Sequence, residues 1–238
     1  MKVPATFRYT GFYDLLCDAI FQHRLAADCS NSYRMNRHAR ASISASSLAL
    51  ECAANCLLEE VDVSAAFVDD LDKLPVISKF DACLRLSGGK ALDRGRAEVQ
   101  KVVELMKVRN EFVHTKTKSI RSEVGPLANQ GPEVCLPVSF DGEMWPALNI
   151  PKRPVFWVAE SAFAVLSAIV VFLRYALVDL KGLSPEEIRN ILVSRVELGN
   201  ITIPMQFEEF LSELSSITSY GLDLAFLGCP NDVAKRAT

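Results

Sequence analysis

The stretch VQKVVELMKVRNEFVHTKTK, residues 99–118, decides how the rest of the chain is interpreted. Its apolar residues recur every three or four positions, which is typical of an amphipathic α-helix and not of a strand. Arg109, Asn110 and His114 fall in the last two turns of this predicted helix. A guanidinium, an amide and an imidazole are groups that can hold a phosphate. These three residues are therefore the first candidates for a functional site.

The same residues also have a structural explanation. A cation near the C-terminal end of a helix interacts favourably with the helix dipole, and an Arg and a His five residues apart occur by chance in many helices. The neighbourhood favours function, because residues 101–121 hold six cations and two anions, a local balance of +4 in a chain of formal net charge -3. The predicted RNA contacts among these cations are Lys107, Lys116, Lys118 and Arg121. A solvated helix face is the alternative for them.

Composition sets broad limits on the chain. Its 238 residues are 50% hydrophobic, enough to bury a substantial core, and the net charge gives no global indication of nucleic-acid binding. The seven cysteines are odd in number and lie mostly in apolar helical stretches, which predicts a reduced, cytoplasmic protein. Cys52 and Cys56 have no second ligand pair at metal spacing, so neither a metal nor a cofactor is expected.

Targeting and membrane segments are not expected either. Residues 1–16 lack the continuous apolar core and the cleavage site of a signal peptide. The longest charge-free apolar run, residues 161–173, is too short to span a bilayer.

Periodicity and turn signals predict an all-α chain. Helices are expected over residues 11–28, 37–60, 75–87, from about 93–96 to the motif, 155–180, 184–196 and 207–219, with an extended segment at 200–204. Residues 117–153 accumulate Gly and Pro and predict one long irregular loop, with a short hairpin around residues 134–145 as an option. This loop leaves directly from the motif helix, so it could cover the site.

Three segments follow from this pattern. Residues 1–35 form an N-terminal helical segment, residues 36–180 a helical core interrupted by the loop, and residues 181–238 a C-terminal helical extension. The segment 155–180 is apolar almost all the way round, which indicates either the central helix of a bundle or a helix buried between subunits.

Two polar residues stand out in the apolar helix over residues 37–60. Glu51 and Asn55 are four positions apart and therefore share a helix face. Buried polar groups need partners, so these two predict a supporting network with another helix. Exposure to solvent is the simpler alternative.

The order of these features resembles the HEPN family of all-α domains. The resemblance covers residues 37–180 and rests most sharply on Arg109, Asn110 and His114, which match the family's Arg, four to six residues, His pattern with a polar residue after the Arg. It implies an up-and-down helical bundle and, in active members, metal-independent RNA cleavage at a homodimer interface. The family occurs in toxin–antitoxin and phage-defence systems, which implies an antitoxin or regulatory protein as a further partner.

The candidate residues suit that chemistry. RNA carries its own nucleophile, the 2'-hydroxyl, so cleavage needs a proton acceptor, a proton donor and positive charge on the phosphate. The imidazole of His114 can act as base or acid, Arg109 can bind the phosphate, and Asn110 can orient the imidazole or bind substrate. Residues five apart on a helix point about 140° away from each other, which favours a site completed by a second subunit. Glu111, directly after Asn110, is an anion that could repel RNA or face solvent.

Three hypotheses stay open on the sequence. The first is a dimeric RNA endonuclease, and the second is a non-catalytic HEPN-like module for interaction or nucleotide binding. The third is an unrelated helical protein with a chance motif. A shared concave site for Arg109 and His114 would argue against the third hypothesis.

Overall fold

The computed structural model is predominantly α-helical, with 64% of the residues in helices and 8% in strands. It describes residues 4–114, 117 and 142–228, and between them only the backbone of the short strands β2 to β5. The α-helices are α1 (Phe12–Ala27), α2 (Ser32–Leu58), α3 (Ala65–Asp72), α4 (Val76–Leu86), α5 (Ala97–Val113), α6 (Ala159–Arg174), α7 (Pro185–Leu192) and α8 (Glu208–Ser216).

Shorter helical turns join these elements. They are η1 (Pro154–Phe156), the π-helical turn η2 (Tyr175–Leu180), which continues α6, η3 (Ile217–Tyr220) and η4 (Ala225–Leu227). The predicted helices are confirmed apart from their ends. The helix expected to begin at residue 37 begins at Ser32, because the side chain of Asn31 accepts a hydrogen bond from the backbone of Arg34 and caps it. The short helix α3 was not predicted.

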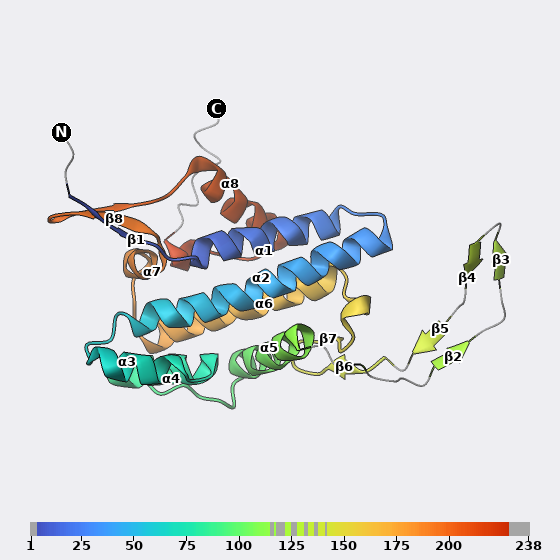
Figure 1. Cartoon of the computed structure of the whole chain (residues 1–238), viewed down its shortest axis with the longest axis horizontal. Coiled ribbons are helices and arrows are strands. Elements are labelled where there is room, and N and C mark those ends of the chain that lie inside the picture. The colour runs from blue at the N-terminus through green and yellow to red at the C-terminus, as the bar shows by residue number, and fades with distance from the viewer. Residues whose placement is uncertain are drawn as a thin grey trace.

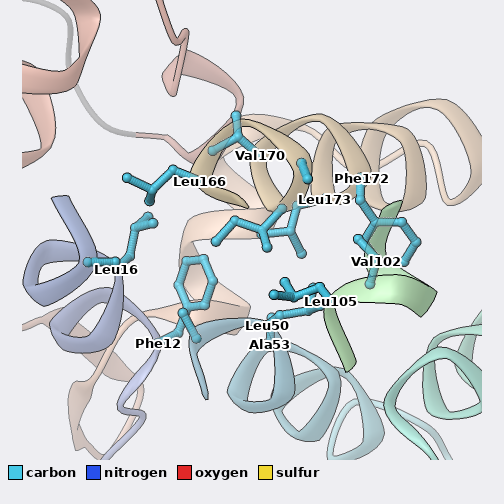
Figure 2. Packing of buried hydrophobic residues seen from close by; sticks show 14 of the residues in the cluster. Phe12, Leu16, Leu50, Ala53, Val102, Leu105, Leu166, Val170, Phe172 and Leu173 are labelled. Carbon is cyan, nitrogen blue, oxygen red and sulfur yellow. The ribbon is translucent and has the colours of Figure 1, made fainter. Parts of the chain in front are cut away.

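Four helices enclose the core. Helices α1 and α2 pack antiparallel along their length, α6 runs beside α2, and α5 closes the other side of α6 (Figure 1). Figure 2 shows their apolar side chains filling one space; the labelled ones are Phe12, Leu16, Leu50, Ala53, Val102, Leu105, Leu166, Val170, Phe172 and Leu173. The small residues of α2, such as Ala49 and Ala53, let the neighbouring helices approach closely.

Helix α6 is the central helix of this bundle. Ala162, Val165, Leu166, Ile169 and Phe172 are completely buried by the chain's own helices. The alternative interpretation of residues 155–180, a helix buried between two subunits, is wrong from residue 159 onward. The chain itself covers α6, apart from a few positions such as Val171.

A small antiparallel sheet ties the two ends of the chain together. Its order is β1 (Thr6–Arg8), β8 (Arg195–Leu198) and β9 (Ile201–Pro204), with Phe7 opposite Val196 and Val196 opposite Ile203. The hydrophobic core accordingly includes residues from all three predicted segments. The helix predicted to run to residue 196 instead ends at Leu192, because the next residues pair as strand β8.

The predicted long loop contains short strands. Among its described residues, β2 (Ser122–Val124) pairs with β5 (Val138–Phe140), β3 (Ala128–Gln130) with β4 (Glu133–Cys135), and β6 (Met144–Trp145) with β7 (Ile150–Pro151). The optional hairpin around residues 134–145 is therefore wrong, because each of its two sides has a different partner. Strands β2 to β5 lie apart from the helices (Figure 1), so their backbone does not cover α5.

Candidate functional site

The motif lies at the C-terminal end of α5. Val99, Val102, Leu105 and Val108 bury one side of this helix against the bundle. The helix ends at Val113, and His114 is its C-cap residue, with φ of -104° and ψ of 50°. Its backbone N–H still donates to the carbonyl of Asn110 at 3.0 Å. The imidazole of His114 is therefore attached to a well-held backbone but extends from the surface.

Arg109 is held by two neighbours. Its Nη2 donates to Oε2 of Glu51 on α2 at 3.3 Å, and its Nη1 donates to Oδ1 of Asn110 at 3.1 Å. The side chains of Arg109 and Glu51 are 31% and 36% exposed, so both atoms of the ion pair remain near water. The Arg109 side chain is thus positioned by α2 and still accessible to a ligand.

Arg109, Asn110 and Glu51 line the same pocket. Its volume is about 350 Å³, and it lies between the middle of α2, the start of α4 and α5. Arg94 and Ser78 add polar groups to its wall. His114 is not part of its lining, so this pocket does not bring Arg109 and His114 together. Lys107 and Glu111 are exposed, and Lys116, Lys118 and Arg121 lie outside the described residues.

Glu51 and Asn55, predicted to belong to one network, have separate partners in the structure. Glu51 joins Arg109, whereas Oδ1 of Asn55 accepts a hydrogen bond from Nζ of Lys79 at 2.7 Å. Lys79, on α4, is buried and also pairs with Asp72 at 2.5 Å. Sequence reasoning missed this lysine, although its place among the apolar residues of α4 was a signal that it points inward. Asn55 therefore supports α4 and not the motif.

Glu104 has a role that the sequence did not indicate. It is one of the two anions in residues 101–121, yet it is buried, and its Oε2 accepts a hydrogen bond from the backbone N–H of Leu148 at 2.7 Å. This bond fastens the β6–β7 hairpin to α5. The chain then leads through η1 to Trp157, whose ring lies 5.5 Å from that of Phe112, two residues before His114. Glu104 and Trp157 together fix the end of α5.

His23 packs inside the protein. It is 3% exposed and lies between the rings of Phe163 and Tyr220, at centroid distances of 5.5 and 4.9 Å. Burial lowers the pKa of His23, and the weaker effects of the Ala159 backbone and of Glu160 and Asp28 oppose that shift. The imidazole of His23 is therefore neutral at pH 7, and its burial keeps it away from a ligand at the surface.

The two neighbouring thiols of α2 differ in chemistry. Cys56 is buried in the hydrophobic core, and the half-buried Cys52 packs against it. A hydrogen bond from the Cys56 thiol lowers the pKa of Cys52 to about 7, while the same bond and, to a smaller extent, burial raise the pKa of Cys56. In the part of the chain that is described, no group of three or more His, Cys, Asp or Glu side chains is arranged to hold a metal ion.

Two helices are long and apolar enough to cross a membrane by length and composition, α2 and the continuous helix Ala159–Leu180. The second includes charged residues at its ends and is longer than the charge-free run identified in the sequence. Most of each helix is buried in the bundle, which is also expected of core helices in a soluble protein, so this is weak evidence for a membrane.

Comparisons with protein-family models, with curated proteins and with solved structures give no match for this chain.

Proposed function

We propose that this protein is a metal-independent RNA endonuclease of the HEPN type, with a bundle of that family formed by α2, α4, α5 and α6. The observation that carries the proposal is the end of α5. There an oriented, water-accessible Arg109 lines a pocket, while the exposed imidazole of His114 lies on the surface between one and two turns further on. Cleavage by the 2'-hydroxyl requires a cation that binds the phosphate and a group that transfers protons, and Arg109 and His114 can supply them.

The active form is a homodimer in this proposal, because the pocket that Arg109, Asn110 and Glu51 line does not include His114. Exposed apolar side chains gather around the end of α5, as expected of a protein interface. They are Leu48, Val113, Val155, Phe156 and Val158. A two-fold axis through this surface would place the end of α5 opposite its own copy and bring two motifs together. A cytoplasmic location, with an antitoxin or regulatory protein as a further partner, is part of the same proposal.

In the proposed reaction, one imidazole accepts a proton and a second imidazole donates one. The 2'-oxygen attacks the neighbouring phosphorus while the imidazole of His114 accepts the 2'-hydroxyl proton. The imidazolium of His114 of the partner subunit donates a proton to the leaving 5'-oxygen, as the P–O5' bond breaks. Arg109 stabilises the negative charge that develops on the phosphate oxygens. The products are a 2',3'-cyclic phosphate and a 5'-hydroxyl end.

The test is cleavage of mixed RNA in EDTA by the wild-type chain, by His114→Ala and by Thr117→Ala. Thr117 is an exposed residue close to the motif and serves as the matched control. We expect His114→Ala to lower the rate by about 100- to 10,000-fold, the usual contribution of general acid–base catalysis, and Thr117→Ala to leave it unchanged. Cleavage that is equal in all three proteins would contradict the proposal, as would products without cyclic phosphate ends.

A second candidate function has an observation of its own. The ion pair of Arg109 with Glu51 is what a non-catalytic HEPN-like interaction or nucleotide-binding module would contain, since the guanidinium then serves the structure. In that case no variant of His114 changes any activity. Arg109→Ala and Glu51→Ala would then lower stability together. Unfolding measurements on those two variants distinguish the two candidates.

A further inference from the structure

The N-terminal part of α2 carries cations without counter-charges. Arg34, Arg37 and Arg40 lie in its first three turns, with His38 between them, and residues 29–50 contain no Asp or Glu. Among the described residues, none of the three guanidiniums lies within ion-pair distance of a carboxylate. Cations at the start of a helix oppose its dipole and cost stability. Helix stability therefore does not account for them, whereas the helix dipole and the cations attract an anion together.

These residues form a pocket with a neighbouring helix. Arg34, Arg37, His38 and Ala41 of α2 and Gln22 of α1 line a volume of about 420 Å³, here called the α2 basic pocket. Nδ1 of His38 lies 2.8 Å from Oε1 of Gln22. Because an amide oxygen can only accept, Nδ1 donates this bond, and Nε2 keeps its hydrogen-bonding capacity for a ligand.

An aromatic ring stands beside the cations. Tyr33 is 68% exposed, and the guanidinium of Arg37 lies 6.0 Å from the centre of its ring. Exposed aromatic rings next to arginines are typical of proteins that bind single-stranded nucleic acids, since the rings stack on bases while the cations follow the phosphates. This combination favours a polynucleotide over a free anion.

The pocket lies at the same end of the bundle as the motif. The side chain of Asn36, next to Arg37, donates hydrogen bonds to the carbonyls of Pro154 and Trp157 at 2.8 and 2.9 Å. The ring of Trp157 packs in turn against Phe112. Figure 1 shows the start of α2 at the end of the bundle where η1 and the start of α6 also lie.

We propose that the α2 basic pocket binds phosphates of the same single-stranded RNA that is cleaved at the end of α5, with Tyr33 stacking on a base. This inference rests on the proposed function for the identity of its ligand. It adds an anchoring site outside the motif, on α1 and α2, that determines affinity and not the chemical step.

The test uses a short, labelled 2'-O-methyl RNA of mixed sequence, which lacks the attacking hydroxyl and stays intact. Its affinity is measured by fluorescence anisotropy over a range of salt concentrations. The variants are Arg34→Gln with Arg37→Gln, and Tyr33→Ala alone. The matched control is Lys90→Gln with Lys181→Gln, which removes the same charge at the opposite end of the bundle, where the backbone N–H of Lys90 donates to the carbonyl of Leu180.

We expect the double arginine variant to bind on the order of tenfold more weakly, and the slope of log K against log salt to fall by about 0.7 for each lost phosphate contact. Tyr33→Ala should weaken binding about fivefold or more without changing that slope, because stacking releases no counterions. The lysine control should match the wild type. In cleavage of ordinary RNA, the arginine variant should need a roughly tenfold higher RNA concentration to reach its half-maximal rate, in line with its lower affinity.

The outcomes separate the two proposals. Equal affinity and salt slope in all proteins would overturn the α2 basic pocket, even if His114→Ala abolishes cleavage. Loss of affinity in the arginine variant with no His114-dependent cleavage would support the pocket and overturn the nuclease. Absence of RNA binding by the wild-type chain at low salt would overturn both.

Discussion

Replacing Arg109 and Glu51, singly and together, separates a catalytic guanidinium from a structural one. Their ion pair spans 3.3 Å, but the two side chains are 31% and 36% exposed. At that exposure water screens the attraction, so we expect a coupling free energy of about 0.2–1 kcal/mol in a double-mutant cycle. For a chain of this size that corresponds to at most about 4 °C in Tm. The effect on cleavage should be far larger, about 100- to 1000-fold for Arg109→Ala, because the guanidinium acts on the transition-state charge.

The assays are urea unfolding of the four proteins and cleavage of RNA in EDTA. Arg85→Ala is the matched control, because Arg85 is an exposed arginine in an ion pair with Asp81 at 3.1 Å on a different helix. It should leave cleavage unchanged. A coupling above about 2 kcal/mol, together with cleavage that Arg109→Ala does not affect, would refute the assignment of Arg109 to the phosphate and favour the non-catalytic module.

Three further predictions follow from buried groups. Burial lowers the pKa of His23, so below about pH 6.5 the unfolded chain takes up the proton before the folded chain does, and the protein should lose stability as the pH falls. The variant His23→Leu should therefore show a flatter pH dependence of Tm between pH 5 and about 6.5. Glu104→Ala should lower the free energy of unfolding by about 2–3 kcal/mol, because the N–H of Leu148 loses a buried, charged acceptor, as urea titration would show. Cys52 has a pKa of about 7, whereas burial raises the pKa of Cys83 to about 11, so Cys52 should react with iodoacetamide at pH 7 much faster than Cys83. Equal labelling of the two cysteines, measured by mass spectrometry, would contradict this prediction.

Local signals in the sequence were sufficient for most of the helices. Helix α7 is an example, because its start depends only on neighbours: Ser184 and Glu187 exchange backbone and side-chain hydrogen bonds across one turn. Strand β8 was misassigned as the end of a helix, because one of its partners, β1, lies almost the full length of the chain away and the local hairpin signal to its other partner, β9, was not used. Gly199, with φ of 57°, begins the two-residue loop between β8 and β9, and this glycine followed by Asn200 was the available hairpin signal.

In the candidate site too, local features could be predicted from the sequence, whereas contacts between distant segments could not. The helix end and the face that carries Arg109 follow from periodicity within α5, so the sequence located them. Which carboxylate would reach Arg109 depended on how α2 packs, and the sequence offered Glu51 and Asn55 as equal members of one network. In the structure Asn55 accepts a hydrogen bond from Lys79 instead, because α4 packs against that turn of α2. A spacing of four residues places two side chains on one face of a helix, but it does not specify which neighbour each one contacts.

The two groups of cations at this end of the bundle differ in what they can do electrostatically. Arg109 shares its charge with Glu51, so its long-range attraction for RNA is reduced, but its guanidinium is held in one orientation. Within the described part of the chain, the arginines at the start of α2 have no such carboxylate, and their charge acts over about one Debye length, roughly 8 Å in physiological salt. In the proposed function these α2 arginines therefore capture the strand, and Arg109 binds the phosphate that reacts. A net charge of -3 is compatible with this arrangement, because capture depends on the local field near α2 and α5 and not on the total charge of the chain.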